Sequence, residues 1–341
     1  YASLICLSPP GAYVGLATSQ KAHCDDLAQV LQDNQARINS MDFHRTEDML
    51  VTASDDDSIH VYNTASGMLT ETVYSKKYGV SNICSTHSQY CVMYATRKPP
   101  ANSNDLSWYS LRYHDIRRNE YVRYFRGHTG PLNTLAMSPK NDIFMSASQD
   151  KTVRLWDMRT NLCQGLMQAP GNPCASFDQQ GLVFAVAATA GVIKLYDVRS
   201  YDKGPFDTFN VTEESNTPVP FSGLRFSNDG KWMLGMMEGR VYVMDAFNGT
   251  VVRRFQTGSQ EGAMSMEAAF SPDSQYVLSG CENSSIKVWH LMNGNEVAEW
   301  TGHAGPPSCL KFAPRRLLVA SACQALTLWI PPPGVLDLEM Q

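Results

Sequence analysis

The chain has 341 residues, of which 43% are hydrophobic and only 18% are charged, and its formal net charge is −5. This acidic balance argues against a strongly basic nucleic-acid-binding domain, and the apolar content is too high for a disordered chain. No apolar run approaches the ~18 residues that a membrane-spanning helix needs, so we expect no membrane segment.

The cysteines indicate a reduced, intracellular protein. Their number is odd, no two stand in a C-x-x-C spacing, and most lie in apolar runs. Small reduced core residues are therefore preferred to a disulfide framework or a zinc site. The nine cysteines are Cys6, Cys24, Cys84, Cys91, Cys163, Cys174, Cys281, Cys309 and Cys323.

Residues 1–26 are predicted to form an N-terminal extension outside the main fold. They contain a short apolar opening, Leu4–Leu7, followed by Pro9-Pro10-Gly11. No basic region precedes the apolar part, so the segment is not typical of a secretory signal peptide.

A pattern of four short β-segments then recurs along the chain. Its clearest copy is residues 131–157, in which Thr152–Asp157 alternates apolar and polar residues with the period of a strand. Seven closing segments, 40 to 52 residues apart, match the ~40–45-residue period of propeller repeats. They end at Tyr62-Asn63, His114-Asp115, Trp156-Asp157, Tyr196-Asp197, Met244-Asp245, Trp289-His290 and Trp329-Ile330.

Seven four-stranded repeats predict an all-β fold, a seven-bladed β-propeller over residues 27–330. The last copy, Ser308–Ile330, supplies only three strands before Pro331-Pro332-Pro333, which cannot donate to a sheet. We therefore expect Leu27–Leu31 to be the missing outer strand, because this pairing removes an exposed edge. Residues 331–341 are expected to form a C-terminal tail.

His128, Ser146, Asp150 and Trp156 have the composition of a nucleophilic triad at first sight. However, the Trp-Asp ending and the pairs Gly127-His128 and Gly302-His303 resemble the WD-repeat family, and the resemblance implies a structural hydrogen-bonded network within one blade. The other copies lack the full set. Asp56 is combined with Tyr62 in the first copy, and Ala190 replaces the Asp in the fourth.

No active site can be assembled outside this network. Asp55-Asp56-Asp57 is interpreted as a solvated turn, because no calcium-loop pattern follows it. A glycine-rich phosphate loop is absent from the sequence. We expect no catalytic, cofactor-binding or metal-binding residues; the alternative is a propeller enzyme with a site in its central channel.

Two segments combine charge with aromatic residues more than a repeat requires. They are Tyr74–Val80, with Lys76, Lys77 and Tyr78, and Arg199–Phe206, with Arg199 and Lys203. The functional interpretation is a partner-binding surface. The alternative is a pair of ordinary connecting loops with solvated lysines.

These segments are similar to the family of WD-repeat subunits in COMPASS-type histone lysine methyltransferase complexes. The family also serves a nuclear protein-phosphatase-1 complex and, in yeast, a cleavage and polyadenylation complex. The segments that carry the resemblance are Tyr74–Val80, Cys163–Met167, Lys194–Arg199, Asp202–Phe206, Phe226–Lys231 and Asp245–Phe247. Residues 1–26 and the loop insertion 97–107 depart from it.

The resemblance implies a non-catalytic adaptor in the nucleus, acting in chromatin regulation and transcription. Its partners would be the catalytic subunit of a histone lysine methyltransferase, a protein-phosphatase-1 targeting scaffold, and the serine-phosphorylated C-terminal tail of RNA polymerase II. No direct sequence-specific binding of nucleic acid is implied. The alternatives are an adaptor of the phosphatase or cleavage complexes in transcription termination, and a WD-repeat adaptor elsewhere, such as a ubiquitin-ligase receptor.

A phosphoserine tail requires Lys or Arg donors, and an acidic chain must supply them as a local patch. The candidates are Lys76, Lys77, Arg123 and Arg126, with Tyr78 as an aromatic contact. We expect these residues to approach one another because they follow or lie on the outer strands of adjacent blades. The alternative is that they are merely solvated and another subunit binds the tail.

Overall fold

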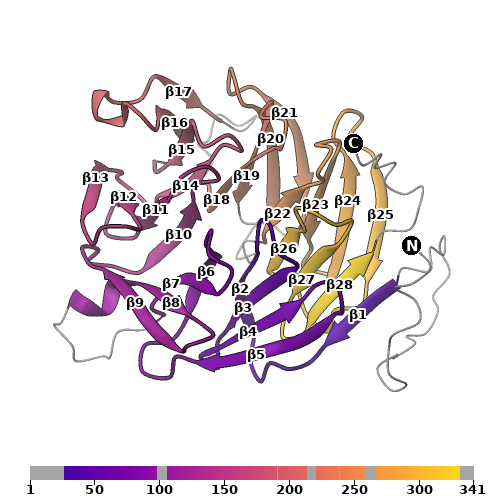
Figure 1. Ribbon diagram of the computed structural model, residues 1–341. Helices are drawn as coiled ribbons and strands as arrows, with labels where there is room; N and C mark the ends of the chain where they lie inside the picture. Colours follow the sequence, from indigo (N-terminus) through magenta and orange to yellow (C-terminus); the bar gives the residue numbers. More distant parts are fainter. Residues whose placement is uncertain are drawn as a thin grey trace.

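Seven antiparallel four-stranded sheets form a ring in the computed structural model of the chain (Figure 1). The structure describes residues 27–97, 106–189, 191–212, 220–237, 239–258 and 266–330. The first strands of adjacent sheets contact one another around most of the ring. Each sheet is therefore one blade with its first strand innermost, and the prediction of a seven-bladed β-propeller is confirmed.

The strands follow one another in chain order within each blade. Blades 1 and 2 contain β2 (Ile38–Phe43), β3 (Met49–Ser54), β4 (Ser58–Asn63), β5 (Met68–Tyr74), β6 (Ser81–Ser85), β7 (Cys91–Ala95), β8 (Leu111–Asp115) and β9 (Glu120–Phe125). Blades 3 and 4 contain β10 (Leu132–Met137), β11 (Ile143–Ser148), β12 (Thr152–Asp157), β13 (Cys163–Gln168), β14 (Cys174–Phe177), β15 (Val183–Ala187), β16 (Val192–Asp197) and β17 (Asp207–Asn210).

Blades 5 and 6 contain β18 (Gly223–Phe226), β19 (Trp232–Met237), β20 (Arg240–Asp245), β21 (Val251–Gln256), β22 (Ala268–Phe270), β23 (Tyr276–Gly280), β24 (Ser285–His290) and β25 (Glu296–Thr301). Blade 7 contains β26 (Cys309–Phe312), β27 (Val319–Ala322), β28 (Leu326–Ile330) and β1 (Leu27–Leu31). The helices in the described part are two short 3₁₀ turns, η1 (Leu106–Tyr109) and η2 (Tyr201–Lys203), and none is long or apolar enough to cross a membrane.

The ring is closed by a strand from the beginning of the sequence. β1 pairs antiparallel with β28, in a register that sets Gln29 opposite Leu328, so the expected outer strand of blade 7 is observed. In Figure 1 the indigo β1 lies beside the yellow β28. The Gln29 amide also donates to the Gly67 carbonyl of blade 1, 3.1 Å away. Residues 1–26 and 331–341 lie outside the described residues, so their assignment as extension and tail stays a prediction.

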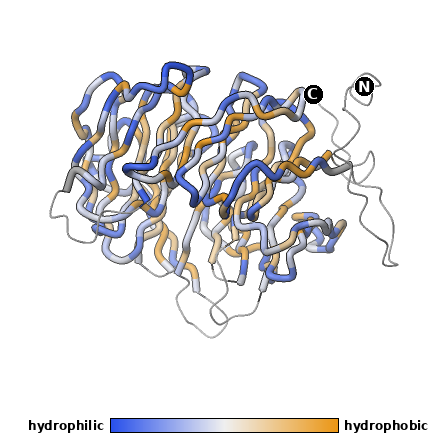
Figure 2. Tube along the Cα trace, turned by 90° about the horizontal axis from the view of Figure 1, so that it is seen from below, coloured by the Kyte–Doolittle hydropathy of each residue, from blue (hydrophilic) through white to orange (hydrophobic). Residues whose placement is uncertain are grey.

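The meander within each blade gives the propeller two different ends. The turns between second and third strands and the connections between blades lie at one end, which we call the inter-blade end. The turns between first and second strands and between third and fourth strands lie at the opposite end. Figure 2, turned by 90°, shows apolar residues running through the strands and hydrophilic residues at many turns.

Apolar clusters fill the spaces between blades. Seven clusters of buried residues each combine side chains from two adjacent blades, including one in which Ile38 of blade 1 packs with Leu326 of blade 7. Both faces of a blade are therefore buried, which explains why strands such as β3 and β7 are apolar on both sides.

Asparagine side chains add polar links between the inner strands. Asn39 donates to the Val80 carbonyl of blade 2, Asn82 to the Leu132 carbonyl of blade 3, and Asn133 to the Pro173 carbonyl of blade 4. The distances are 3.0, 3.1 and 3.0 Å. Each asparagine thus satisfies a carbonyl that lies just before or within the inner strand of the next blade.

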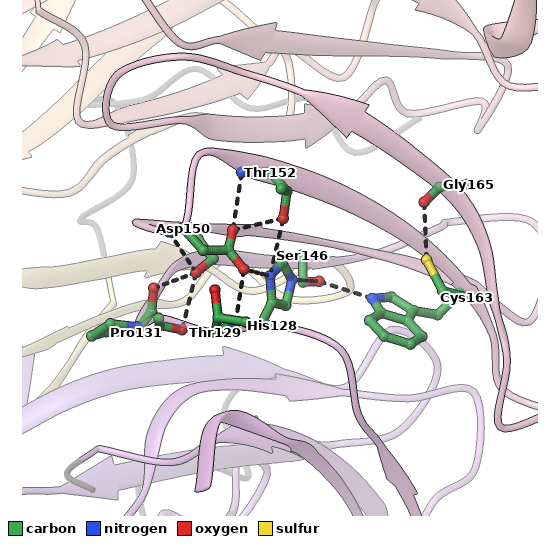
Figure 3. A network of polar contacts seen from close by, with 11 residues as sticks. His128, Thr129, Pro131, Ser146, Asp150, Thr152, Cys163 and Gly165 are labelled. Carbon is green, nitrogen blue, oxygen red and sulfur yellow. Dashed lines mark hydrogen bonds and ion pairs between the residues drawn. The ribbon is translucent and has the colours of Figure 1, made fainter. Parts of the chain in front are cut away.

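The His128 network is continuous in blade 3 (Figure 3). The His128 ring contacts an Asp150 oxygen at 2.8 Å through Nδ1 and the Ser146 hydroxyl at 2.7 Å through Nε2, and the Trp156 indole donates to the same hydroxyl at 2.8 Å. All four side chains are largely withdrawn from water, and each polar group has a partner. The network joins the inter-blade connection to the second and third strands, as a structural role requires.

Blade 7 carries a shortened version of this network. His303 contacts the Ser321 hydroxyl at 2.6 Å, and the Trp329 indole donates to that hydroxyl at 2.7 Å. No carboxylate stands beside the ring among the described residues; His303 Nδ1 lies 3.3 Å from the Cys323 sulfur instead. Burial without a carboxylate lowers the pKa of His303 to about 4.

The structure also bears on the predictions for the cysteines and for the turn Asp55–Asp57. The seven described cysteines are free thiols, six of them buried; Cys6 and Cys24 lie outside the described residues. The turn Asp55–Asp57 is held rather than simply solvated, because Asp55 pairs with Arg97 at 2.9 Å and Asp56 accepts a hydrogen bond from the Ser58 amide. No group of three or more potential metal ligands occurs in the described part of the chain. Ala190 is outside the described residues.

Removing parts of the blade 3 network should destabilise the protein unequally. Trp156→Ala is expected to lower the free energy of unfolding by about 3–5 kcal/mol, since it empties a fully buried site. His128→Ala should cost about 1–3 kcal/mol because it leaves Asp150 and Ser146 short of a partner. Urea denaturation measures both, with the exposed His87→Ala as a control expected to change stability by less than about 0.5 kcal/mol. A neutral Trp156→Ala would contradict the network.

Stability should also fall in mild acid because of His303. Its folded pKa of about 4 lies below the ordinary 6.5, so the unfolded chain takes up a proton that folded His303 rejects. The contribution is complete above pH 6.5 and is lost as the pH falls toward 4, with a slope of about 1.4 kcal/mol per pH unit. The free energies of unfolding of wild type and His303→Asn at pH 7 and pH 5 test this. The variant should show the shallower pH dependence, and equal slopes would refute the assignment.

Candidate partner-binding surface

The connection from blade 1 to blade 2 forms a tight turn at the inter-blade end. The Ser75 amide donates to the Asp57 carbonyl at 2.9 Å, and the Gly79 amide donates back to the Ser75 carbonyl at 2.8 Å. Gly79 has a φ of 69°, a left-handed conformation that favours glycine. The turn thereby presents Lys76 and Lys77 to solvent.

Aromatic rings lie beside both lysines. The Lys76 ammonium is 5.5 Å from the centre of the Tyr74 ring, and the Lys77 ammonium is 5.1 Å from that of Tyr78. The other side of the cluster is buried: the Arg112 guanidinium lies 3.6 Å from the Tyr78 ring centre, and Trp108 packs against Tyr78 at 5.0 Å. We call Tyr74, Lys76, Lys77, Tyr78, Trp108, Arg112, Tyr124 and Arg126 the basic–aromatic cluster.

Arg126 joins this cluster from the end of blade 2. Arg126 is exposed and directly follows Phe125, the last residue of β9. Burial raises the pKa of Tyr124, and the positive charges of Arg112 and Arg126 act against that shift. The Lys77 ammonium likewise lowers the pKa of Tyr78. Among the described residues, no carboxylate forms an ion pair with Lys76, Lys77 or Arg126. The cluster is therefore a local excess of positive charge on an acidic protein.

The cluster occupies the place where blade 3 has its histidine network. Phe125 and Val73 are equivalent buried residues of outer strands, since they pair with Leu111 and Ile59. The third residue after Phe125 is His128, and the third after Val73 is Lys76. Blade 2 thus begins with an exposed lysine where blade 3 begins with a buried histidine.

The buried side chains of blade 2 also differ from those of blade 3. By strand register, Tyr94 stands where blade 3 has Ser146, because it faces Arg112 as Ser146 faces Arg154. The Tyr94 hydroxyl contacts His114 Nδ1 at 3.3 Å, and the two side chains are fully buried. The same hydroxyl lies 3.4 Å from that of Ser75, next to Lys76 in the sequence, and Lys76 itself is exposed.

The structure separates the other candidates from this cluster. The Arg123 guanidinium donates to the Met158 carbonyl of blade 3, so the expectation that it adjoins Lys76 and Lys77 is wrong. The reason is that alternation along β9 turns Arg123 toward blade 3 and Tyr124 toward the cluster. Arg199 and Lys203 lie between β16 and β17, hence at the opposite end of the propeller.

The segment with Arg199 and Lys203 is held against the neighbouring blade. The Tyr201 hydroxyl donates to the Gln164 carbonyl at 3.0 Å, and its ring covers Gly165 so closely that an added Cβ there would lie 2.5 Å away. Arg199, Lys203 and Phe206 remain exposed. This is a second surface, distinct from the basic–aromatic cluster.

Three members of the cluster were not found from the sequence: Trp108, Arg112 and Tyr124. Tyr124 is an outer-strand residue with no motif that marks it. Arg112 lies in an alternating strand, where an arginine is normally assigned to solvent. Only the packing of blade 2 against the turn brings it under Tyr78.

Comparison with known proteins shows to which family the chain belongs. The family model described as "WD domain, G-beta repeat" matches residues 25–63, 119–157 and 249–290. The chain is 42% identical to "Protein ANTHESIS POMOTING FACTOR 1" of Arabidopsis thaliana over 90% of this chain and 91% of the relative. It is 39% identical to "WD repeat-containing protein 82" of Drosophila melanogaster, over 89% of this chain and 94% of the relative.

The chain belongs to the family of WD repeat-containing protein 82. A Saccharomyces cerevisiae relative, "COMPASS component SWD2", is 29% identical over 86% of this chain and 90% of the relative. Residues 64–118, which hold Lys76, Lys77, Tyr78 and Arg112, lie outside the matched repeats. Residues 158–248 and 291–341 also lie outside the matches, so most of blade 2 is one of several parts of the chain that differ from the general repeat.

Proposed function

We propose that this protein is a non-catalytic WD-repeat adaptor of a COMPASS-type histone lysine methyltransferase complex in the nucleus. The observation that carries the proposal is similarity along nearly the whole propeller to a relative named as a COMPASS component. Its direct partner there is the catalytic methyltransferase subunit. A closed propeller suits this role, because its two ends and outer strands offer separate surfaces on one rigid body.

The finer proposal is that the basic–aromatic cluster binds the serine-phosphorylated C-terminal tail of RNA polymerase II. A phosphoserine carries roughly two negative charges and three acceptor oxygens. Lys76, Lys77 and Arg126 offer donors without competing ion pairs among the described residues, and Tyr74 and Tyr78 offer ring faces beside them. An extended phosphopeptide can contact both kinds of group at once.

Reversing the two lysine charges should weaken this binding. Lys76→Glu with Lys77→Glu is expected to reduce affinity for a phosphorylated tail peptide at least about tenfold at low salt, because two charge-assisted contacts become repulsive. Fluorescence anisotropy with a labelled peptide measures this. Wild-type binding should also weaken as salt rises, since the attraction is screened.

The matched control is Arg199→Glu with Lys203→Glu, which makes the same change in net charge at the opposite end. It should bind the tail peptide like wild type. If the Lys76/Lys77 variant binds as well as wild type at low salt, the cluster is not the tail site and another subunit binds the tail. If both variants weaken binding equally, the effect is one of net charge and the site assignment fails.

Affinity purification from nuclei tests the wider assignment. The methyltransferase catalytic subunit should be enriched with the tagged chain, as identified by mass spectrometry. Recovery of a protein-phosphatase-1 targeting scaffold or of cleavage and polyadenylation factors, without the methyltransferase, would support the alternative adaptor role in transcription termination. The exposed Arg199, Lys203 and Phe206 are the proposed contacts for a protein partner, and their substitution should release one partner while tail binding persists.

A further inference from the structure

Arg112 is a buried cation with no anionic partner among the described residues. The residue is 1% exposed, and its Nη1 donates to the Ser110 carbonyl at 3.2 Å. Its Nε has no partner. An arginine in such a place is costly unless other groups compensate for the lost water.

Tyrosine rings provide that compensation. The guanidinium lies 3.6 Å from the centre of the Tyr78 ring and 5.9 Å from that of Tyr124. A desolvated cation held against aromatic faces is a favourable electrostatic contact. Burial lowers the pKa of Arg112, and the phenol groups of Tyr94, Tyr121 and Tyr78 oppose that effect. The guanidinium is thus bound mainly by aromatic groups, and Tyr78 is the one that belongs to the inter-blade turn.

The equivalent arginine of blade 3 has a similar relation to its own connection. Arg154 lies against Gly127, where an added Cβ would be 2.3 Å from its Nη1, and 5.9 Å from the Trp156 ring centre. In blade 3, however, His128 independently fixes the connection through Asp150 and Ser146. In blade 2 that histidine is replaced by Lys76, so this position makes no such attachment.

The turn from blade 1 to blade 2 is held by fewer side-chain contacts than the connection that contains His128. Ser75, which is buried, lies 3.4 Å from the hydroxyls of both Tyr94 and Tyr121, at the long limit of a hydrogen bond. Beyond Ser75, the Arg97 amide donates to the Tyr78 carbonyl at 3.3 Å, and the side chain of Tyr78 contacts Arg112 and Trp108. The Lys77 ammonium in turn lies 5.1 Å from the centre of the Tyr78 ring.

We propose that Arg112 is a positioning residue: it fixes Tyr78, and through Tyr78 the exposed Lys76–Lys77 pair, in the orientation that a phosphorylated segment requires. The effect on peptide binding rests on the proposed tail binding. The claim that Arg112 fixes the turn does not depend on it. Arg112 substitutes for the missing histidine network by holding the turn from beneath. A turn that is ordered before binding loses less entropy when the peptide binds.

The first test is limited trypsin digestion, which does not require the tail peptide. Trypsin cleaves after Lys76 and Lys77 only when the turn opens, so cleavage reports how firmly the turn is held. Arg112→Lys keeps the charge but loses the planar stacking group, and cleavage at these two bonds should accelerate roughly tenfold. Arg154→Lys, the matched variant in blade 3, should leave this rate unchanged. Mass spectrometry identifies the cut sites.

The second test is affinity for the phosphorylated tail peptide. Arg112→Lys should weaken binding by about fivefold, the scale of one desolvated cation–π contact. Its salt dependence should match that of wild type, because Lys76, Lys77 and Arg126 are still present. Arg154→Lys should bind like wild type. Arg112→Met serves as a second variant, since replacing a buried charge by an apolar group of similar length usually permits folding; it should give the same two effects.

The outcomes separate the two proposals. Faster cleavage in both Arg112 variants, combined with no peptide binding by wild type, supports the positioning role and rejects the tail site. If wild type binds the peptide but the Arg112 variants match Arg154→Lys in cleavage and in affinity, the positioning role is overturned and the tail site survives.

Discussion

The pairing of β1 with β28 is the constraint on which the rest of the structure depends. Every blade buries both faces against its neighbours, and the core between blades 7 and 1 forms only when the ring closes. The outer strand of blade 7 comes from Leu27–Leu31, some three hundred residues away in sequence from β28. Closure therefore ties the two ends of the propeller chain together and removes an exposed sheet edge.

Within the closed ring, the inter-blade connections are held by different means in different blades. Blade 3 uses a full histidine network, and blade 7 uses a shorter one in which Cys323 stands beside His303. Blade 2 has neither, because Lys76 takes the position of the histidine, and Tyr94 and His114 contact each other in its interior instead. The absence of the internal hydrogen-bonded histidine from blade 2 thus leaves an exposed charge at the inter-blade end.

The presence of Lys76 in place of a histidine matters because of the charge on the rest of the protein. The chain is acidic overall, so a phosphorylated partner is repelled by most of the surface and attracted only where cations lack carboxylate neighbours. The inter-blade end of blades 1 and 2 has this property, and its aromatic rings keep the cations close to the protein without neutralising them. The opposite end, with the exposed Arg199 and Lys203, carries a surface of different composition.

The sequence by itself determined the fold, because seven in-phase repeats with a two-residue apolar period can bury their faces only as propeller blades. It also determined the closing strand, since Pro331–Pro333 cannot continue the last sheet. It indicated Lys76, Lys77 and Tyr78, which are neighbours along the chain. Only the tertiary structure decided which distant residues join them: Arg112 and Tyr124 come within reach of Tyr78 by the packing of blade 2, whereas Arg123, next to Tyr124 in sequence, points to blade 3. The physical reason is that alternation assigns a side chain to a face of its strand, but the bulge between Tyr113 and His114 and the packing of the blades decide what that face meets.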